Sequence, residues 1–574
     1  MKIYKITLGL LILGLLVSCS KKIDKDPTAS ISIDEMSNLV VDSDFQWQSG
    51  LIGEFTVTFN NPYNVSTELE IINIIDSEGQ IVKRNRIVDG QVKFNVELPQ
   101  NSKYYLQFPI TEDVLEITSI QDLTMELGPT ASYKSAAGVN EDVPSCTSCD
   151  NPIINSGAEQ PVINSGYTII HQDQVPGWET TATDHKIEIW KSGFNGVPSQ
   201  EGNQFFELNA NQVADLFQEL CLEPGSTIIW SVWHRGRSGV DVAEVKIGAT
   251  VESAVTMATM SDGTSAWGHY TGSYTVPDGQ TNTFFVFSSV SSAGSASYGN
   301  FLDNFEIACD YDGDGVPDDE DDAPGDPEVA FKSYFPTSGK QIVAFEDLWP
   351  SLGDFDFNDL TMSNQVVMSQ NIDFEILSAD FKVSIDAIGA GLHNGIGMML
   401  YDGNGNEISS NIIASVSGDV SIDPDNTNGL ILTDDVYSFI ESYYQNNGMG
   451  PTSIPDTLRF TVTFTGNLLD FTPELYIFRN NDRSHEVHRS NFPPTAAADL
   501  NLFNQYDDNG NYETSNGLPW GIEIILEGNY HSPREKIEIL AAYPQFQQWA
   551  QSGGTQNTDW YNYPNPALVF DIFE

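Results

Sequence analysis

The clearest chemistry in this sequence lies in a run of carboxylates near the middle of the chain, which reads D-Y-D-G-D-G-V-P-D-D-E-D-D-A-P over residues 310–324. Its aspartates occupy positions 1, 3, 5, 9 and 12 of a loop, namely Asp310, Asp312, Asp314, Asp318 and Asp321. Ca²⁺ is a hard cation that takes oxygen ligands at this spacing, and Gly315 at position 6 permits the sharp turn that gathers them. The alternative is an acidic linker whose charges repel each other and keep it extended. We predict Ca²⁺ binding, because a random acidic tract would not combine Gly315 with alternating aspartates.

A second set of oxygen ligands follows in the segment G-D-F-D-F-N-D, where three side chains alternate with phenylalanine: Asp354, Asp356 and Asn358. In an extended chain these three point to one side and the aromatic rings to the other, which predicts a second Ca²⁺ site backed by buried rings. Glu346 and Asp347 lie a short distance upstream. The alternative is a surface loop held by Asx-turns. Similar runs at 402–406 and 507–511 are more typical of hairpin turns.

Flat aromatic and polar planar side chains gather between residues 178 and 241, namely Trp178, Trp190, Trp233, His234, Arg235, Arg237 and Asp241. A sugar site needs aromatic faces for pyranose rings and bidentate groups for vicinal hydroxyls, and this set supplies both. The alternative is that the tryptophans are core residues and that the basic groups pair with Asp241 and Glu188.

Patterns that indicate catalysis do not stand out. The histidines of His485-Glu-Val-His488 are three apart rather than the four of a zinc-protease helix. A glycosidase needs two carboxylates about 5 to 9.5 Å apart, but in so acidic a chain such a pair can be drawn anywhere. We found no G-x-S-x-G, P-loop or Cys-His arrangement, so we predict that the protein is not an enzyme.

The N-terminus reads as an export signal over residues 1–18, with two lysines, an apolar run and then Cys19 after Leu-Val-Ser. The L-V-S-C sequence resembles a bacterial lipobox, which implies cleavage before Cys19, a lipid on its sulfur and a tether over 19–30. An ordinary signal peptide or a short anchor helix is the alternative. The resemblance implies an outer-membrane anchor, and we expect the protein to face the cell surface rather than the periplasm.

The formal net charge of −56 argues against nucleic acid and anionic membrane surfaces as partners. Disorder does not explain the acidity, because 40% of the residues are hydrophobic and 11% aromatic, which is enough to bury real cores. We infer an exported protein whose carboxylates are partly neutralised by divalent cations.

Four cysteines follow Cys19, namely Cys146, Cys149, Cys221 and Cys309. An even number in an exported chain predicts disulfides. We favour a bridge between the start and the end of the 146–309 region, although a four-thiolate zinc site is an alternative.

Short apolar runs separated by Gly, Asn and Pro turns predict an all-β protein, built as a string of antiparallel β-sandwiches and jelly rolls with an Asp-rich calcium joint. We divide the chain into a small β-sandwich at 31–145, a jelly-roll module at 146–309, the joint at 310–327 and a C-terminal domain at 328–574.

Three regions resemble known families. The joint is similar to a thrombospondin type-3 repeat and ends in Ala-Pro where many repeats have Cys-Pro. The 146–309 region, through pieces such as Asn155-Ser-Gly-Ala-Glu159, W-S-V-W-H-R-G-R and Leu302-Asp-Asn-Phe305, resembles carbohydrate-binding-module jelly rolls. That resemblance implies one structural Ca²⁺ held by Glu159 and Asp303.

The C-terminal region, through F-E-D-L-W-P, G-D-F-D-F-N-D and His485-Glu-Val-His488, resembles the LruC domain of bacterial lipoproteins, a domain of unknown function. We predict a calcium-stabilised, non-catalytic outer-membrane lipoprotein that binds a glycan or a surface protein through its jelly roll. The alternative is a structural or accessory subunit that docks on another outer-membrane protein.

Overall fold

The computed structural model describes residues 35–42, 45–61, 70–109, 111, 113–128, 145–147, 152–389, 391–439, 456–490 and 492–570. Within these residues the chain forms six β-sheets, and its helices are one or two turns long. The prediction of an all-β protein is confirmed. The short helices are η1 (Met36–Asn38), η2 (Gln172–Gln174), η3 (Phe194–Gly196), α1 (Val436–Phe439), η4 (Leu500–Leu502), α2 (Ile539–Ala542), α3 (Phe546–Gln551) and η5 (Trp560–Asn562).

The N-terminal β module packs a three-stranded sheet, β5-β2-β8, against a four-stranded sheet, β4-β3-β6-β7. Alternating apolar residues on the facing sides of the two sheets build one core, as the period of a half-buried strand requires. The strands are β2 (Leu51–Asn60), β3 (Ile71–Asp76), β4 (Ile81–Arg86), β5 (Gln91–Leu98), β6 (Tyr104–Phe108), β7 (Asp113–Ile117) and β8 (Leu123–Glu126).

The 146–309 module is a sandwich of a five-stranded sheet, β10-β13-β18-β15-β16, and a six-stranded sheet, β17-β14-β19-β12-β11-β9. The predicted bridge between its ends is present as the Cys146–Cys309 disulfide, and Cys221 is also disulfide-bonded. The strands are β9 (Tyr167–His171), β10 (Glu179–Thr180), β11 (Lys186–Lys191), β12 (Gln204–Glu207), β13 (Asp215–Leu220), β14 (Thr227–Arg235), β15 (Asp241–Gly248), β16 (Val255–Asp262), β17 (Gly268–Thr275), β18 (Thr283–Ser291) and β19 (Phe301–Cys309).

The C-terminal domain packs an eight-stranded sheet on a five-stranded sheet around one large core. The first contains β1 (Gln48–Ser49), β20 (Phe331–Phe335), β21 (Lys340–Phe345), β22 (Leu360–Gln370), β23 (Ile376–Ala387), β25 (Ile413–Gly418), β28 (Asp456–Phe464) and β31 (Gly521–Leu526). The second contains β24 (Asn394–Asp402), β26 (Ser421–Ile422), β27 (Leu430–Thr433), β29 (Phe471–Arg479) and β30 (Asp482–Val487).

The start of the described chain belongs to the C-terminal domain and not to the small sandwich in which the sequence analysis placed it. β1 pairs in parallel with β31, and the Trp47 indole donates to the Gly517 carbonyl at 2.9 Å. Met36, Phe45 and Trp47 are buried in a second C-terminal core with α2, α3 and η5. The large aromatic rings of that core attract the segment, with the ring of Trp47 stacked on that of Phe546 at 5.9 Å.

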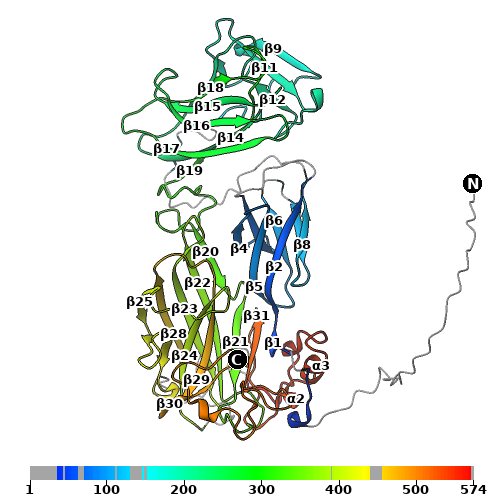
Figure 1. Cartoon of the computed structure of the whole chain (residues 1–574), viewed down its shortest axis with the longest axis vertical. Helices are drawn as coiled ribbons and strands as arrows, with labels where there is room; N and C mark the ends of the chain where they lie inside the picture. Colours follow the sequence, from blue (N-terminus) through cyan, green and yellow to red (C-terminus); the bar gives the residue numbers. More distant parts are fainter. Residues whose placement is uncertain are drawn as a thin grey trace, which may run out of the picture.

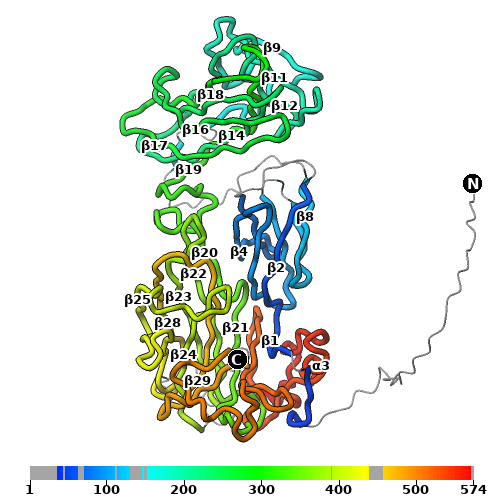
Figure 2. The backbone as a smooth tube through the Cα atoms, in the orientation of Figure 1, coloured from blue at the N-terminus to red at the C-terminus, as the bar shows by residue number. Residues whose placement is uncertain are grey.

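The 146–309 module forms one end of the molecule, and the other two units lie side by side at the other end (Figure 1). The tube view shows the chain leaving β19 and entering β20 through a compact turn structure between the two ends (Figure 2). Direct contacts join the units: His269 of β17 meets Glu70 at 3.0 Å, and Lys83 of β4 meets Asp470 at 3.6 Å. No helix in the described part of the chain is long and apolar enough to cross a membrane. Cys19 and Cys149 lie outside the described residues.

Candidate metal centres

The Asp-rich joint folds into a tight loop that gathers its first three carboxylates. One oxygen each from Asp310, Asp312 and Asp314 lies within 4.8 Å of the others. Backbone N–H groups hold the loop closed, with Gly313 donating to Asp310 Oδ1 at 2.8 Å and Val316 to Asp314 Oδ1 at 2.8 Å. Gly315 has a φ of 99°, a conformation that only glycine adopts without strain.

The oxygens left over at the joint fit a cation. The second carboxylate oxygens of three aspartates are buried and have no hydrogen-bond partner: Asp312, Asp314 and Asp321. Burial, with repulsion from Asp312 and Asp310, raises the pKa of Asp314 to about 6. Burial and then repulsion from Asp314 raise the pKa of Asp321 to about 7. Closely spaced acids without a counter-charge are the environment that a bound divalent cation relieves.

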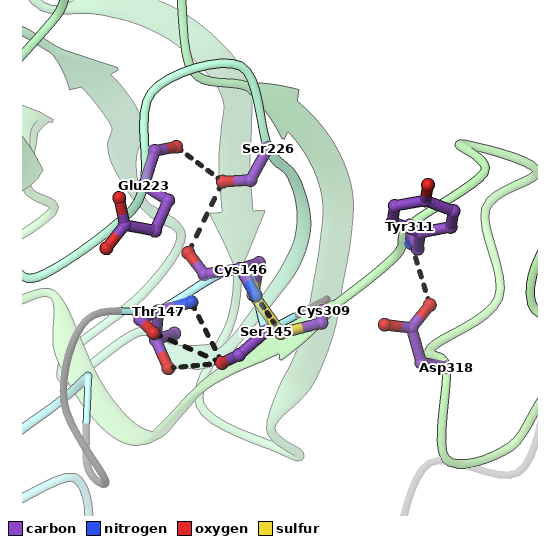
Figure 3. Close-up of a disulfide and its surroundings, with 8 residues drawn as sticks. All are labelled: Ser145, Cys146, Thr147, Glu223, Ser226, Cys309, Tyr311 and Asp318. Carbon is purple, nitrogen blue, oxygen red and sulfur yellow. Dashed lines mark hydrogen bonds between the residues drawn. A yellow bond between two sulfur atoms is a disulfide. The ribbon is translucent and has the colours of Figure 1, made fainter. Parts of the chain in front are cut away.

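The joint is fastened at both of its ends. Asp310 follows Cys309 directly, and the Asp318 N–H donates to the Cys309 carbonyl at 2.9 Å. Asp318 Oδ1 accepts the Tyr311 N–H at 2.7 Å, beside the Cys146–Cys309 disulfide (Figure 3). At the other end Asp322 pairs with Arg84 of the N-terminal module. The loop therefore lies between the 146–309 sandwich and the N-terminal module, and hydrogen bonds or ion pairs hold it at both ends.

Glu159 and Asp303 hold the same loop of the sandwich from two sides. Asp303 is fully buried and accepts the Gln200 and Glu201 N–H groups at 2.7 and 3.0 Å, while Glu159 accepts the Gln204 N–H at 2.8 Å. Burial raises the pKa of Asp303 well above its ordinary value. In the described chain the three-ligand clusters lie elsewhere, so a Ca²⁺ between these two carboxylates stays a prediction.

The second predicted set, Asp354, Asp356 and Asn358, lies on a loop between β21 and β22 and not on a strand. Phe355 and Phe357 have positive φ values of 55° and 48°, and both rings are buried in the second C-terminal core. The carboxylates that gather here are those of Glu346, Asp354 and Asp356. The side-chain oxygen of Asn358 is buried without a hydrogen-bond partner, so Asn358 stays a predicted ligand. Asn358 donates its amide to the Pro533 carbonyl at 3.0 Å.

The tryptophans expected to present an aromatic surface are buried, which corrects that expectation. Trp178, Trp190 and Trp233 are 1%, 1% and 2% exposed. Trp178 packs in the sandwich core at 4.5 Å from the ring of Phe305. Trp190 and Trp233 lie in a smaller cluster with Trp267, whose loop covers that face of the sheet. They offer no open face to a sugar.

The polar members of the predicted sugar site pair with each other and with the backbone. His234 contacts Asp262 at 2.7 Å and Asn300 at 2.9 Å, and an Arg235 guanidinium nitrogen donates to a carbonyl in the loop that carries Trp267. Asp241, also buried, accepts three backbone N–H groups. These groups are paired, as the alternative expects, but the partners of His234 are Asp262 and Asn300 instead of Asp241 and Glu188.

Arg237 occupies a stack at the rim of the six-stranded sheet. Its guanidinium donates to both oxygens of Glu207 at 2.7 Å and lies 3.2 Å from the ring centre of Tyr298. The Trp190 indole N–H lies within hydrogen-bond distance of Glu188 and Glu207. Burial, then repulsion from Glu207, raises the pKa of Glu188 to about 8. Tyr298, which sequence reasoning missed, is 40% exposed, and Tyr167 beside Trp190 is 52% exposed.

The His485-Glu-Val-His488 motif is structural. His485 contacts the Trp349 carbonyl at 2.5 Å, while His488 lies buried between Glu474 and Glu486 at 3.2 and 3.0 Å. The two histidines therefore have different partners. In the described chain, the groups of side chains that could hold a metal ion do not include either histidine.

The comparisons place one family in the C-terminal domain. Residues 375–561 match a family model described as Domain of unknown function (DUF4842), which covers a third of the chain and brings no reaction with it. No curated protein matches this chain.

Solved structures with similar parts include a "Putative lipoprotein from Bacteroides ovatus", 14% identical, with a TM-score of 0.31 over 69% of this chain and 99% of that one. The CBM22-2 xylan-binding domain of Paenibacillus barcinonensis Xyn10C is 12% identical, with a TM-score of 0.20 over 25% of this chain and 98% of that one. The tandem CBM22-1–CBM22-2 domains of the same protein are 12% identical, with a TM-score of 0.23 over 58% and 97%.

Proposed function

We propose that this protein is a non-catalytic, calcium-stabilised lipoprotein of a bacterial outer membrane that presents its 146–309 sandwich to a glycan or a surface protein. The observation that carries the proposal is the joint, a loop of partnerless carboxylate oxygens fastened to the sandwich at one end and to the N-terminal module at the other. A cation in this loop fixes the angle at which the sandwich is displayed. Fixed presentation is a property of recognition proteins, since it lowers the entropy lost on binding.

The anchor in this proposal is Cys19, on the lipobox resemblance, and the base is the region that resembles the LruC domain. We place the protein on the cell surface. Protease treatment of intact cells tests that placement, because a periplasmic protein would be protected until the outer membrane is opened.

The binding surface in the proposal is the rim of the six-stranded sheet, defined by Tyr167, Arg237 and Tyr298. Arg237 lies between the buried part of the sheet and the exposed ring of Tyr298. Exposed aromatic faces stack on pyranose rings, and a guanidinium donates to neighbouring hydroxyls. The buried tryptophans beneath this rim serve as its support. In the same proposal, Glu159 and Asp303 bind a Ca²⁺ ion that stabilises the loop 199–204.

Replacing the rim tyrosines is expected to weaken ligand binding. A chain that starts at residue 20 is screened on a glycan array and its best ligand is measured by calorimetry with Tyr167→Ala and Tyr298→Ala. Each loss of a stacking face should raise the Kd about fivefold, since such contacts contribute about 1 kcal/mol.

The matched control for this prediction is Tyr334→Ala, because Tyr334 is also 40% exposed but lies on β20 of the C-terminal domain. Binding that survives both rim substitutions contradicts the rim. An array without any ligand, together with a β-barrel protein that co-purifies from membranes, would favour the accessory-subunit alternative.

A further inference from the structure

A second carboxylate cluster lies deep in the C-terminal domain, away from the joint. It joins Glu346, directly after β21, to Asp354 and Asp356 of the loop before β22. One oxygen of each side chain lies within 4.8 Å of the others. The cluster therefore draws ligands from two segments that the sheet brings together.

One oxygen of this cluster is buried without any partner. Glu346 is 1% exposed, and its Oε1 accepts the Phe357 N–H at 2.7 Å, whereas its Oε2 has no hydrogen bond. Gly353 lies against that free oxygen so closely that a Cβ at this position would be 1.7 Å from it. A buried carboxylate oxygen is normally satisfied, so this one indicates a ligand that the protein side chains do not provide.

The surrounding charges do not neutralise the cluster. Lys536 donates its backbone N–H to Asp356 Oδ2 at 2.7 Å, but its ammonium group lies 3.6 Å from Glu535. Asp347 and Asp359 add two more carboxylates beside the cluster. The backbone N–H of Asp347 donates to Asp359 Oδ2 at 2.8 Å. Among the ion pairs of the described chain, none includes an acid of the cluster or either of the two acids beside it, namely Glu346, Asp354, Asp356, Asp347 and Asp359.

We propose that Glu346, Asp354 and Asp356 bind a Ca²⁺ ion, which fastens the 353–359 loop to β21 and to the segment around Lys536. Three carboxylates without a His or Cys ligand suit a hard, oxygen-preferring cation. The number of carboxylates favours Ca²⁺ over Mg²⁺, which usually keeps several waters and takes one or two carboxylates.

The ion has a structural task in this place. The loop that it holds inserts Phe355 and Phe357 into the core that also buries Met36 and Trp47. The Phe355 carbonyl accepts the Ile539 N–H at 2.9 Å, which connects the loop to α2. The ion thus supports the core on which the N-terminal segment of the described chain is seated.

The test separates this site from the joint. A chain from residue 20 onward carries Asp312→Asn and Asp314→Asn to disable the joint and Glu159→Gln to disable the proposed Glu159–Asp303 site, is stripped with a chelator and is titrated with Ca²⁺ in a calorimeter. We expect about one equivalent of Ca²⁺ to bind, and Glu346→Gln in the same background to weaken it at least 100-fold. The matched control is Asp386→Asn, which changes a buried carboxylate of β23 whose oxygen accepts from Ser363 and lies outside the cluster.

A second readout holds whether or not the variants fold equally well. Ca²⁺ should raise the Tm of the joint-disabled protein and leave the Tm of its Glu346→Gln variant unchanged. In chelator the Glu346→Gln variant should melt no lower than its parent, because it removes a buried charge that has no counter-ion. No Ca²⁺ uptake by the folded joint-disabled protein, or an equal Ca²⁺ effect on both Tm values, would overturn the proposal. Because the joint is absent from every variant, neither result bears on the proposed function.

Discussion

Disabling the joint with Asp312→Asn and Asp314→Asn is expected to open the chain between residues 310 and 327 to proteases. Each of these two side chains satisfies one oxygen with a backbone N–H and leaves the other buried and unpaired. Without a cation, the carboxylates that remain there repel each other, and no ion holds the two halves of the loop together. With Ca²⁺ about 1,000-fold above its Kd, the ion stabilises the folded loop by about 4 kcal/mol, which is the amount the variant forfeits.

Limited proteolysis with mass spectrometry measures this effect, in Ca²⁺ and in chelator. The native protein should be cut within 310–327 only in chelator, and the double variant in both. Asp319→Asn is the control, since it removes a charge from the same run at a position outside the ligand spacing. Cutting that is equally slow in all four conditions would show that the backbone hydrogen bonds alone hold the joint. Protection should increase with Ca²⁺ concentration, as mass action requires.

Features with a local signature were predictable from the sequence. The Asp-rich loop was one, because its aspartates lie within twelve positions and its turn depends on a glycine. The all-β class was another, because the alternation of apolar residues is read strand by strand. The Cys146–Cys309 bridge followed from the two cysteines standing at the ends of one region.

Features that depend on distant segments were not predictable. Alternation places Trp190 on one face of β11 and Trp233 on one face of β14, but it does not tell whether a loop such as that of Trp267 covers the face. In the same way, nothing local indicates that β1 pairs with β31, because the partner of Gln48 is Glu523. The carboxylate of Glu346 lies beside those of Asp354 and Asp356 through the path of the folded loop, in which Phe355 and Phe357 adopt a left-handed backbone.

The role of the His485-Glu-Val-His488 motif also depends on residues that are distant in the sequence. Its spacing excludes a zinc-protease helix, yet the role of His488 depends on Glu474 of β29, a partner that only the pairing of β29 with β30 brings close. The ring of His488 also stacks on Tyr476 at 4.4 Å, with Tyr512 at 5.2 Å. The sequence excludes catalysis by this motif, but only the fold shows that His488 belongs to a buried network of charges.

Replacing His488 with Gln is therefore expected to destabilise the C-terminal domain by about 3–5 kcal/mol at pH 6, because it leaves two buried carboxylates without their shared cation. Burial by itself would lower the pKa of His488, but Glu474 and then Glu486 outweigh it and raise the pKa to about 9. Burial would raise the pKa of Glu486, but its hydrogen bond and attraction to His488 lower it to about 2, with help from Thr495 and Arg483.

The sign of the pH dependence follows from these directions. His488 has a higher pKa in the folded state, so its contribution is complete below its ordinary pKa of 6.5 and is lost as the pH rises through about 9. The contribution of Glu486 is complete above its ordinary value of 4.5 and is lost as the pH falls through about 2. The difference in unfolding free energy between the native protein and His488→Gln should thus be largest near pH 5 to 6 and smaller at pH 9.

Urea denaturation of both proteins at pH 6 and pH 9 measures that difference, with the fluorescence of the buried C-terminal tryptophans as the signal. His393→Gln is the matched control, because the His393 side chain is 58% exposed and pairs with Asp435, an interaction that contributes less than about 1 kcal/mol. A penalty for His488→Gln that is the same at both pH values would mean that packing against Tyr476, and not charge, is what the imidazole supplies. A penalty that shrinks towards pH 9 would assign the motif to electrostatic stabilisation of the domain, since packing of a neutral ring does not titrate.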